Sequence, residues 1–228
     1  AANGTGTVYA NGASYAFTSN ITLYAQWTAN TLTVTYDSDG GSAVTAGSTT
    51  TGSSISTAPT PPTLTGATFA GWGTTKNASS LITFPYVHGQ TSNFTLYAQW
   101  VQNPVFSNYT LKRTGVADTT PAVGIGYSFT YLPNDSGIYL VANASVTYGG
   151  TLSYKWINNS TGNTLQDWSS SNSILIPSAS ASNGYHYQAV IRNTRFTITT
   201  ETTASGSLYP QMDTQGYITN AGDRTLNY

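Results

Sequence analysis

The chain repeats one short segment almost unchanged. Residues 18–28 read TSNITLYAQWT and residues 91–101 read TSNFTLYAQWV, so the two copies differ at only two positions. The copies are 73 positions apart (91 − 18). Such self-similarity predicts that a structural unit of about 70 residues recurs along the chain. A sequence with this signal is expected to fold as successive small modules, each around its own core.

The shared pentapeptide LYAQW has the period of a β-strand. In the second copy, Leu96, Ala98 and Trp100 project to one side, and Tyr97 and Gln99 project to the other. Burial of one Leu and one Trp contributes about 4 kcal/mol when both are fully covered. We therefore expect the tryptophan of each copy to face a core.

Composition favours an ordered all-β protein with few ionic groups. Only 7% of residues are charged and the formal net charge is -1, whereas nucleic-acid binding and polybasic membrane attachment need clustered cations. Ser and Thr make up 66 of 228 residues, and Thr and Tyr suit a pleated, half-buried surface. The chain has no cysteine, which rules out disulfides, thiolate metal sites and thiol nucleophiles. We expect an exported protein that folds without disulfides.

Residues 29–102 contain the pattern of a complete unit. Leu32, Val34 and Tyr36 alternate along a first strand, and residues 37–41 (DSDGG) are rich in turn formers. A proline-rich extended stretch follows, and the unit ends with a strand that contains LYAQW.

This unit resembles a known family. The stretches LTVTYDSDGGSAV (32–44), TAPTPPTLTGATFAGW (57–72) and FTLYAQW (94–100) are similar in order and spacing to the Listeria–Bacteroides repeat, the B-repeat type of long bacterial surface proteins. The resemblance implies a small β-grasp-like module at the cell surface.

Residues 1–28 contain only the last third of such a unit. A fragment of this kind would expose its tryptophan and leave strand edges unpaired. Two explanations are open, and the first is favoured. Either the chain is a segment of a longer array, or the missing strands come from a neighbouring molecule by strand addition.

Residues 103–205 lose the repeat motif and alternate in a different way. Leu152, Tyr154 and Trp156 share one face of a strand, and residues 183–190 alternate again. Short strands separated by turns predict a β-sandwich.

The same stretch resembles a bacterial immunoglobulin-like domain. The resemblance implies that Trp156 is the core tryptophan of the third strand and that Tyr187 is the tyrosine-corner residue. Ala142 and Ala189 would then occupy the positions of the two sandwich cysteines. Residues 206–228 are expected to be a tail, a linker or the start of a further module.

Catalytic and metal-binding patterns are missing from the sequence. His88 and His186 are 98 positions apart (186 − 88) and have no companion at ligand spacing, so we expect two surface histidines. Asp37 and Asp39 begin like a calcium loop, but the residues that follow break the pattern, and a hairpin turn is the better interpretation. We predict no catalytic residue, no cofactor and no metal site.

Three aromatic residues are candidate ligand contacts. Trp168, Tyr97 and Tyr185 lie in a loop or out of phase with the expected core, where a ring can stack on a sugar. Packing against neighbouring modules is the favoured alternative. The chain also carries Asn-x-Ser/Thr triplets, the acceptor pattern for glycans in exported proteins, at Asn20, Asn77, Asn93, Asn108, Asn134, Asn143, Asn158 and Asn159.

The predicted fold class is all-β, with small β-grasp-like repeat modules followed by an immunoglobulin-like β-sandwich. The expected core residues are Trp27, Trp72, Trp100, Trp156 and Tyr187.

The predicted function is that of a non-enzymatic structural segment of an exported, extracellular bacterial cell-surface protein: a stalk, filament or surface-layer building block. Two alternatives stay open, namely an adhesin module for carbohydrate or another host or cell-surface ligand, and an accessory domain of an extracellular enzyme. Expected partners are other copies or adjacent modules of one long chain, with carbohydrate as a further candidate. Neither nucleic acid nor membrane insertion within this chain is expected.

Overall fold

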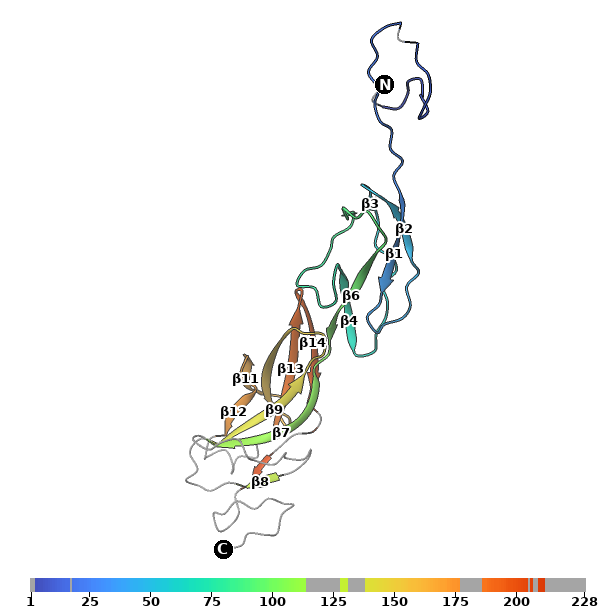
Figure 1. Cartoon of the computed structure of the whole chain (residues 1–228). Coiled ribbons are helices and arrows are strands. Elements are labelled where there is room, and N and C mark those ends of the chain that lie inside the picture. The colour runs from blue at the N-terminus through green and yellow to red at the C-terminus, as the bar shows by residue number, and fades with distance from the viewer. Residues whose placement is uncertain are drawn as a thin grey trace.

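The computed structural model describes residues 3–16, 18–113, 128–130, 138–176, 186–204, 206 and 209–211, and these ranges contain strands and turns but no helix. The chain is all-β, as composition and alternation predict. Two modules follow one another along an elongated molecule, and the N-terminal segment precedes the first of them (Figure 1). Among the described residues, the search for a helix with the length and hydropathy of a membrane span finds none.

The first module is built on a four-stranded mixed sheet. Its strands are β1 (Thr31–Asp37), β2 (Gly47–Thr50), β4 (Ala67–Gly73) and β6 (Phe94–Gln102), in the order β2-β1-β6-β4. β1 runs parallel to β6, and the other neighbours are antiparallel. β3 (Ser54–Ile55) and β5 (Tyr86–Val87) form a separate short pair. The first and last strands of the unit thus lie side by side at the centre of the sheet.

Apolar residues with the predicted period fill the core of this module. In β1, Leu32, Val34 and Tyr36 are buried, while the threonines between them are exposed. Trp72 of β4 packs on Tyr36 with ring centroids 5.0 Å apart. Trp100 of β6 completes the same cluster. The strand period therefore fixes which face of each strand is buried.

The turn after β1 is attached to the core by Trp100. Asp37 Oδ1 accepts the N–H of Asp39 at 2.8 Å, and Asp39 has a φ of 48°. The Trp100 indole N–H donates to the Ser38 carbonyl at 3.0 Å. Gly41 is required for space, because a Cβ there would lie 2.7 Å from the Trp100 ring. The aspartate pair therefore shapes a turn, as the sequence indicates.

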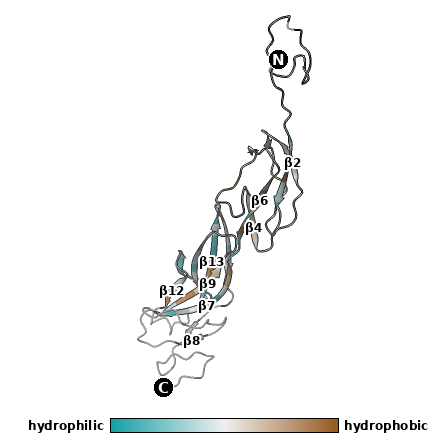
Figure 2. Ribbon diagram, viewed as in Figure 1, coloured by the Kyte–Doolittle hydropathy of each residue, from teal (hydrophilic) through white to brown (hydrophobic). Residues whose placement is uncertain are grey.

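The second module has two facing sheets and is sandwich-like. One sheet has the order β11-β10-β13-β14 and the other has the order β12-β9-β7. The strands are β7 (Val105–Arg113), β9 (Ile138–Ser145), β10 (Thr151–Asn158), β11 (Thr164–Ser169), β12 (Ser173–Ile176), β13 (Tyr187–Arg195) and β14 (Ile198–Thr203). β8 (Ser128–Thr130) and β15 (Tyr209–Gln211) form a short parallel pair. Figure 2 shows hydrophobic stretches in the strands, notably in β9.

One buried cluster joins the two sheets of this module. Trp156 and Tyr187 enter it from one sheet, and Leu140 and Ile174 enter it from the other. Trp156 is fully buried and stands opposite Ala189 in the β10–β13 pairing. The core is therefore filled by aromatic and aliphatic side chains from both sheets.

Tyr109 forms a polar link within this core that the sequence analysis did not single out. It lies on β7, and its phenol oxygen accepts the main-chain N–H of Ala189 on β13 at 3.1 Å. Burial raises the pKa of Tyr109 to about 12, because a phenolate would lose its hydration there. Ala142 and Ala189 are both fully buried, one in each sheet. The hydrogen bond thus crosses between the sheets.

Replacing Tyr109 by Phe tests this link. The variant leaves the Ala189 N–H without its acceptor, so the free energy of unfolding should fall by about 1–3 kcal/mol near neutral pH. In the parent, the fold favours the neutral phenol, so the stabilisation is complete below pH 10 and is lost as the pH rises toward about 12. That loss is at most about 3 kcal/mol. Urea unfolding at several pH values should show a shallower alkaline decline for Tyr109→Phe, and equal declines would contradict the assignment.

Candidate functional site

The junction between the two modules is the strongest candidate for a functional site. β6 ends at Gln102 and β7 begins at Val105, so two residues connect the modules. The β13–β14 hairpin of the second module also contacts β6 (Figure 1). Side chains from both modules exchange hydrogen bonds at this place. The junction is therefore more than a linker.

Arg195, the last residue of β13, reaches from the second module into the first. Its Nη1 donates to the Trp100 carbonyl at 2.9 Å. Its Nη2 donates to the Ala78 carbonyl at 3.2 Å and to Gln99 Oε1 at 3.4 Å. Burial lowers the pKa of the Arg195 guanidinium, because the charged form loses part of its hydration there. One side chain thus joins β6 and the β4–β5 loop to the hairpin.

A tight turn positions Arg195. Arg195 pairs with Ile198, and the two residues between them, Phe196 and Thr197, have φ values of 51° and 66°. Positive φ at both positions defines a type I′ hairpin turn, which prefers Asn, Asp or Gly. The guanidinium carbon of Arg195 lies 4.4 Å from the centroid of the Phe196 ring. The turn at Phe196 and Thr197 therefore places the Phe196 ring against the Arg195 guanidinium.

Gln102, the last residue of β6, makes a second set of contacts. Its carbonyl accepts the amide Nδ2 of Asn193 at 2.9 Å and the hydroxyl of Thr200 at 2.9 Å. Its side-chain Oε1 accepts the main-chain N–H of Thr147. Asn193 is fully buried, and Gly150 leaves room for it, since a Cβ at Gly150 would lie 2.0 Å from the Asn193 side chain. The end of β6 is thus held by β13, β14 and the β9–β10 loop.

Tyr148 of the β9–β10 loop forms the third contact. Its hydroxyl donates to the Asp39 carbonyl at 3.1 Å, and its ring packs against the core cluster of the first module. Tyr148 of the second module therefore contacts the same turn, at Asp39, that Trp100 contacts from the core at Ser38.

Gln99 shows how the junction changes the expected burial pattern. Alternation predicts that Gln99 projects away from the core, yet it is fully buried. Its Nε2 donates to the Thr75 carbonyl at 2.9 Å and its Oε1 accepts from Arg195. Both faces of β6 are covered near its end, because Thr75 of the first module and Arg195 of the second module both contact Gln99 on the outer face. The recurrence of Gln in both LYAQW copies does not signal this role, because Gln26 of the first copy is exposed.

The structure places four of the five expected core residues in cores. Trp72, Trp100, Trp156 and Tyr187 are at most 2% exposed. Trp27 is the exception, because it is 91% exposed. The prediction that Trp27 is a core residue is therefore wrong for this structure. The reason is that no described strand pairs with the segment that carries it.

The two described candidates for ligand contact carry a cation over the ring. Arg192 lies 3.7 Å from the centroid of the half-buried Trp168 ring and pairs with Glu201 at 2.7 Å. Lys76 lies 6.0 Å from the centroid of the half-buried Tyr97 ring. Tyr185 lies outside the described residues. These contacts favour internal packing of Trp168 and Tyr97.

The expected surface position of His88 is wrong. Its side chain is 6% exposed, and its ring packs on Phe94 with centroids 5.0 Å apart. Nδ1 accepts the Gln90 N–H at 3.0 Å, so in the neutral ring Nε2 carries the proton and donates to Thr49 Oγ1 at 3.1 Å. His88 is therefore a structural residue of the first module. His186 is half-exposed just before β13.

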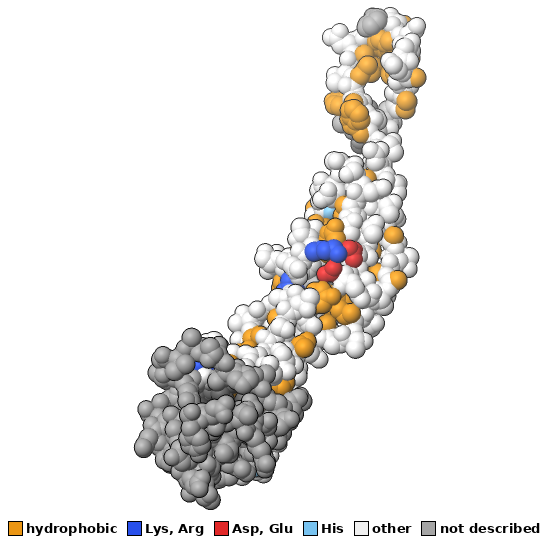
Figure 3. Space-filling view, turned by 60° about the horizontal axis from the view of Figure 1, so that its bottom comes forward, with side chains coloured by type: hydrophobic (Ala, Val, Ile, Leu, Met, Phe, Trp, Pro, Cys, Tyr) orange, Lys and Arg blue, Asp and Glu red, His pale blue; other side chains and the backbone are white. Residues whose placement is uncertain are grey.

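Charged groups form local pairs. Lys76 Nζ lies 2.9 Å from Asp39 and 3.5 Å from Asp37, and Figure 3 shows opposite charges clustered on this face of the first module. The hydrogen bond to Asp39 raises the pKa of Lys76. Among the described residues, no three His, Cys, Asp or Glu side chains gather as a metal site would require.

The predicted glycan acceptors differ in accessibility. Asn158 is buried, and its Oδ1 accepts the Ser160 N–H at 3.0 Å. Asn143 Nδ2 donates to Asn108 Oδ1 at 2.8 Å, which makes these two half-buried residues a cross-strand pair. Asn134 lies outside the described residues. The remaining acceptors are exposed, namely Asn20, Asn77, Asn93 and Asn159.

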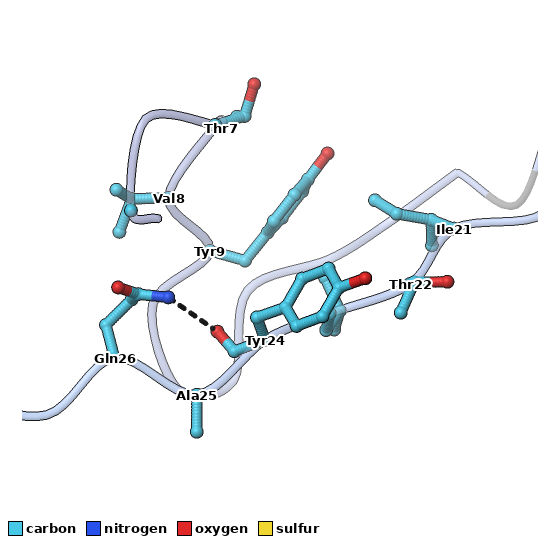
Figure 4. A pocket seen from close by; sticks show the side chains of 11 residues that line it. Thr7, Val8, Tyr9, Ile21, Thr22, Tyr24, Ala25 and Gln26 are labelled. Atoms are coloured by element: carbon cyan, nitrogen blue, oxygen red, sulfur yellow. Dashed lines mark hydrogen bonds between the residues drawn. The ribbon is translucent and has the colours of Figure 1, made fainter. Parts of the chain in front are cut away.

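The N-terminal segment forms a small open hollow of about 480 Å³ (Figure 4). Its lining comes from residues 4, 6–9 and 21–26, and none of the lining side chains is charged. Val8 and Leu23 remain largely exposed beside it. Without an acid, a base or a cation, this lining offers apolar contact and hydrogen bonds from Thr, Tyr and Gln.

Comparison with known proteins finds a similar family for the first module. Residues 33–99 match the family model of the Listeria-Bacteroides repeat domain, a repeat typical of bacterial surface or exported proteins. A protein of Evansella cellulosilytica, which carries the provisional name of a membrane protein, is 40% identical over 86 residues. That match covers 38% of this chain and 13% of the relative. No solved structure matches the chain. The immunoglobulin-like resemblance of residues 103–205 stays a prediction.

The two LYAQW copies give a matched test of burial. Trp100→Ala should lower the free energy of unfolding of the first module by about 3–5 kcal/mol, because it removes a buried indole and its bond to Ser38. Trp27→Ala should change stability by less than about 0.5 kcal/mol, because that side chain is exposed. Urea unfolding with hydrogen-exchange readout on β1 and β6 measures both. Equal losses in the two variants would contradict the structure.

Proposed function

We propose that this chain is a non-enzymatic structural segment of an exported bacterial cell-surface protein, in which the junction holds two successive modules in one orientation. The observation that carries the proposal is the set of side-chain hydrogen bonds across the junction. Arg195, Asn193, Thr200 and Tyr148 of the second module bond to main-chain carbonyls of the first. A segment that sets direction as well as spacing suits a stalk, a filament or a surface-layer building block.

The energetics support a fixed junction. Domains within one chain move relative to one another unless their interface opposes it. Each hydrogen bond contributes about 0.5–1.5 kcal/mol net, so four such contacts add up to several kcal/mol when they form together. The two-residue connection between β6 and β7 limits the remaining freedom. A bent state would have to break these bonds and expose Gln99.

The low fraction of charged residues supports other copies of this chain or adjacent modules as partners. Only 7% of the residues are charged, so neighbouring copies or adjacent modules can approach with little repulsion. We propose such copies or modules as the partners, at an extracellular location on the cell surface. The fully buried Ala142 and Ala189, one in each sheet beside Trp156, support an immunoglobulin-like identity for the second module.

Carbohydrate binding by an adhesin module is the second candidate function. The observation that favours it is the position of Trp168, which is half-exposed on the edge strand β11. Arg192 covers one face of this ring, so a sugar would have to stack on the other face. This occupied ring makes carbohydrate binding the weaker candidate. An accessory domain of an extracellular enzyme remains a third reading that no observation favours.

Removing Arg195 tests the fixed junction. The chain has no cysteine, so Ser53→Cys and Ser160→Cys place two spin labels uniquely, one in each module. The parent should give a narrow distance distribution by pulsed electron resonance. Arg195→Ala should broaden it at least about twofold, because three acceptors in the first module lose their donor.

Arg192→Ala is the matched control for that experiment. Arg192 lies on the same strand, but it pairs with Glu201 and Trp168 inside the second module. Its removal should leave the distribution narrow. A broad distribution in the parent, or no change in Arg195→Ala combined with Thr200→Val, would refute the proposed role of the junction.

A further inference from the structure

The first and last strands of the first module connect it to the rest of the chain. β1 begins at Thr31, after the N-terminal segment, and β6 ends at Gln102, just before the second module. The two strands are neighbours and run parallel. Figure 1 shows the chain entering at one end of the module and leaving at the other. We infer that this module resists tension along the chain, and that the β1–β6 ladder is the element that resists it.

Tension on the chain pulls β1 and β6 in opposite directions along their length. The pull on β1 acts at its first residue, and the pull on β6 acts at its last residue. Because the strands are parallel, these pulls shear the ladder between them. Its four registered pairs, from Val34–Phe94 to Asp37–Tyr97, then share the force. Two strands separated from one end instead lose their hydrogen bonds one after another, so each bond in turn meets the whole force.

The order of the sheet makes this ladder the connection between the two halves that are pulled. In the order β2-β1-β6-β4, β2 pairs with β1 and β4 pairs with β6. β2 therefore moves with the strand that follows the N-terminal segment, and β4 moves with the strand that leads to the second module. Separating the two halves of the sheet requires the loss of all four β1–β6 pairs.

Side-chain hydrogen bonds extend the connection at both ends of the ladder. Asn93 Oδ1 accepts the main-chain N–H of Thr33 at 2.7 Å, one residue before the first registered pair. At the other end, the Trp100 indole N–H donates to the Ser38 carbonyl at 3.0 Å. The bonds between the two strand regions therefore extend from residue 33 to residue 38 of the first one.

Packing in the core opposes a gradual slip of β1 along β6. Val34 and Tyr36 of β1 share one buried cluster with Leu96 and Trp100 of β6. The Tyr36 ring also packs on Trp72 of β4, with centroids 5.0 Å apart. A shift of one residue would turn the apolar side chains of β1 to the outer face of the sheet. Shear must therefore detach β1 rather than move it to a new register.

The full chain can be pulled from the same end of β1 in two directions. It has no cysteine, so Ala29→Cys and Asn103→Cys attach single-molecule handles that pull as chain tension would. Ala29→Cys and Ser53→Cys instead separate the start of β1 from the end of β2. All three positions are exposed. The antiparallel β1–β2 ladder also has four registered pairs, so the two experiments differ in the direction of the force on matched ladders.

The rupture force should depend on this direction. At one loading rate, the force for handles at residues 29 and 103 should exceed that for residues 29 and 53 at least about twofold, because forced unfolding follows the barrier of the step that the force accelerates. Opening of the whole module frees 74 residues (103 − 29), which is up to about 240–270 Å of extended chain and identifies the event. Equal forces, or a lower force for residues 29 and 103, would overturn the inference.

Asn93→Ala tests whether the ladder is where the force is resisted. The variant removes the acceptor of the Thr33 N–H, so the lifetime of the module under constant force on residues 29 and 103 should fall about 2–10-fold. Asn20 has the same position in the first TSN copy, so Asn20→Ala is the matched control and should leave the lifetime unchanged. An unchanged lifetime in Asn93→Ala would overturn the assignment of the β1–β6 ladder.

This inference goes beyond the proposed function, which concerns the orientation of the modules. Handles at residues 29 and 103 flank only the first module, so the force does not pass through the second module. The result therefore does not depend on the bonds of Arg195, and failure here is distinguishable from failure of the proposed junction.

Discussion

The structure depends on Trp100, which forms one hydrogen bond through its side chain and another through its main-chain carbonyl. Its indole fills the core of the first module and donates to Ser38, which fixes the turn after β1. Its main-chain carbonyl accepts Arg195 from the second module. The same residue therefore belongs to the core that makes the module stable and to the junction that orients its neighbour. Loosening of that core would also move the carbonyl on which Arg195 depends.

The central position of β6 explains why one strand can serve both purposes. β1 and β4 hold it on either side, so its backbone is fixed along most of its length. Its inner face carries Leu96, Ala98 and Trp100 into the core, and the outer face of its last residues is covered by the second module. A chain with few charged residues can cover such a face with amides, hydroxyls and one guanidinium. Direct bonds to main-chain carbonyls then do not depend on particular side chains in the first module.

Local sequence patterns predicted the elements well and their environment less well. The alternation of Leu32, Val34 and Tyr36, and the turn chemistry of Asp37 and Asp39, identified structure that depends on neighbours along the chain. The burial of Gln99, by contrast, involves Thr75, which lies 24 positions earlier, and Arg195, which lies 96 positions later. Burial of this kind leaves no periodic signal in its own strand.

His88 and the junction residues also depend on contacts between residues far apart in the sequence, which local patterns do not predict. His88 was expected at the surface because it has no companion at ligand spacing, but its partner Thr49 is supplied by β2, 39 positions earlier. The junction residues Arg195 and Asn193 lie in no motif. The family resemblance also stops before the second module, because the family model matches residues 33–99. A contact between two modules can be predicted from sequence only when both are recognised together.

The two LYAQW copies separate what a sequence specifies from what its surroundings supply. Residues 23–27 and 96–100 are identical, so their intrinsic strand propensities are identical. Yet one copy is a central strand with a buried tryptophan, and the other is paired with no described strand and exposes Trp27. The difference in burial must therefore come from long-range pairing with β1 and β4. In this chain, residues 96–100 form a strand between β1 and β4, whereas the identical residues 23–27 form no described strand.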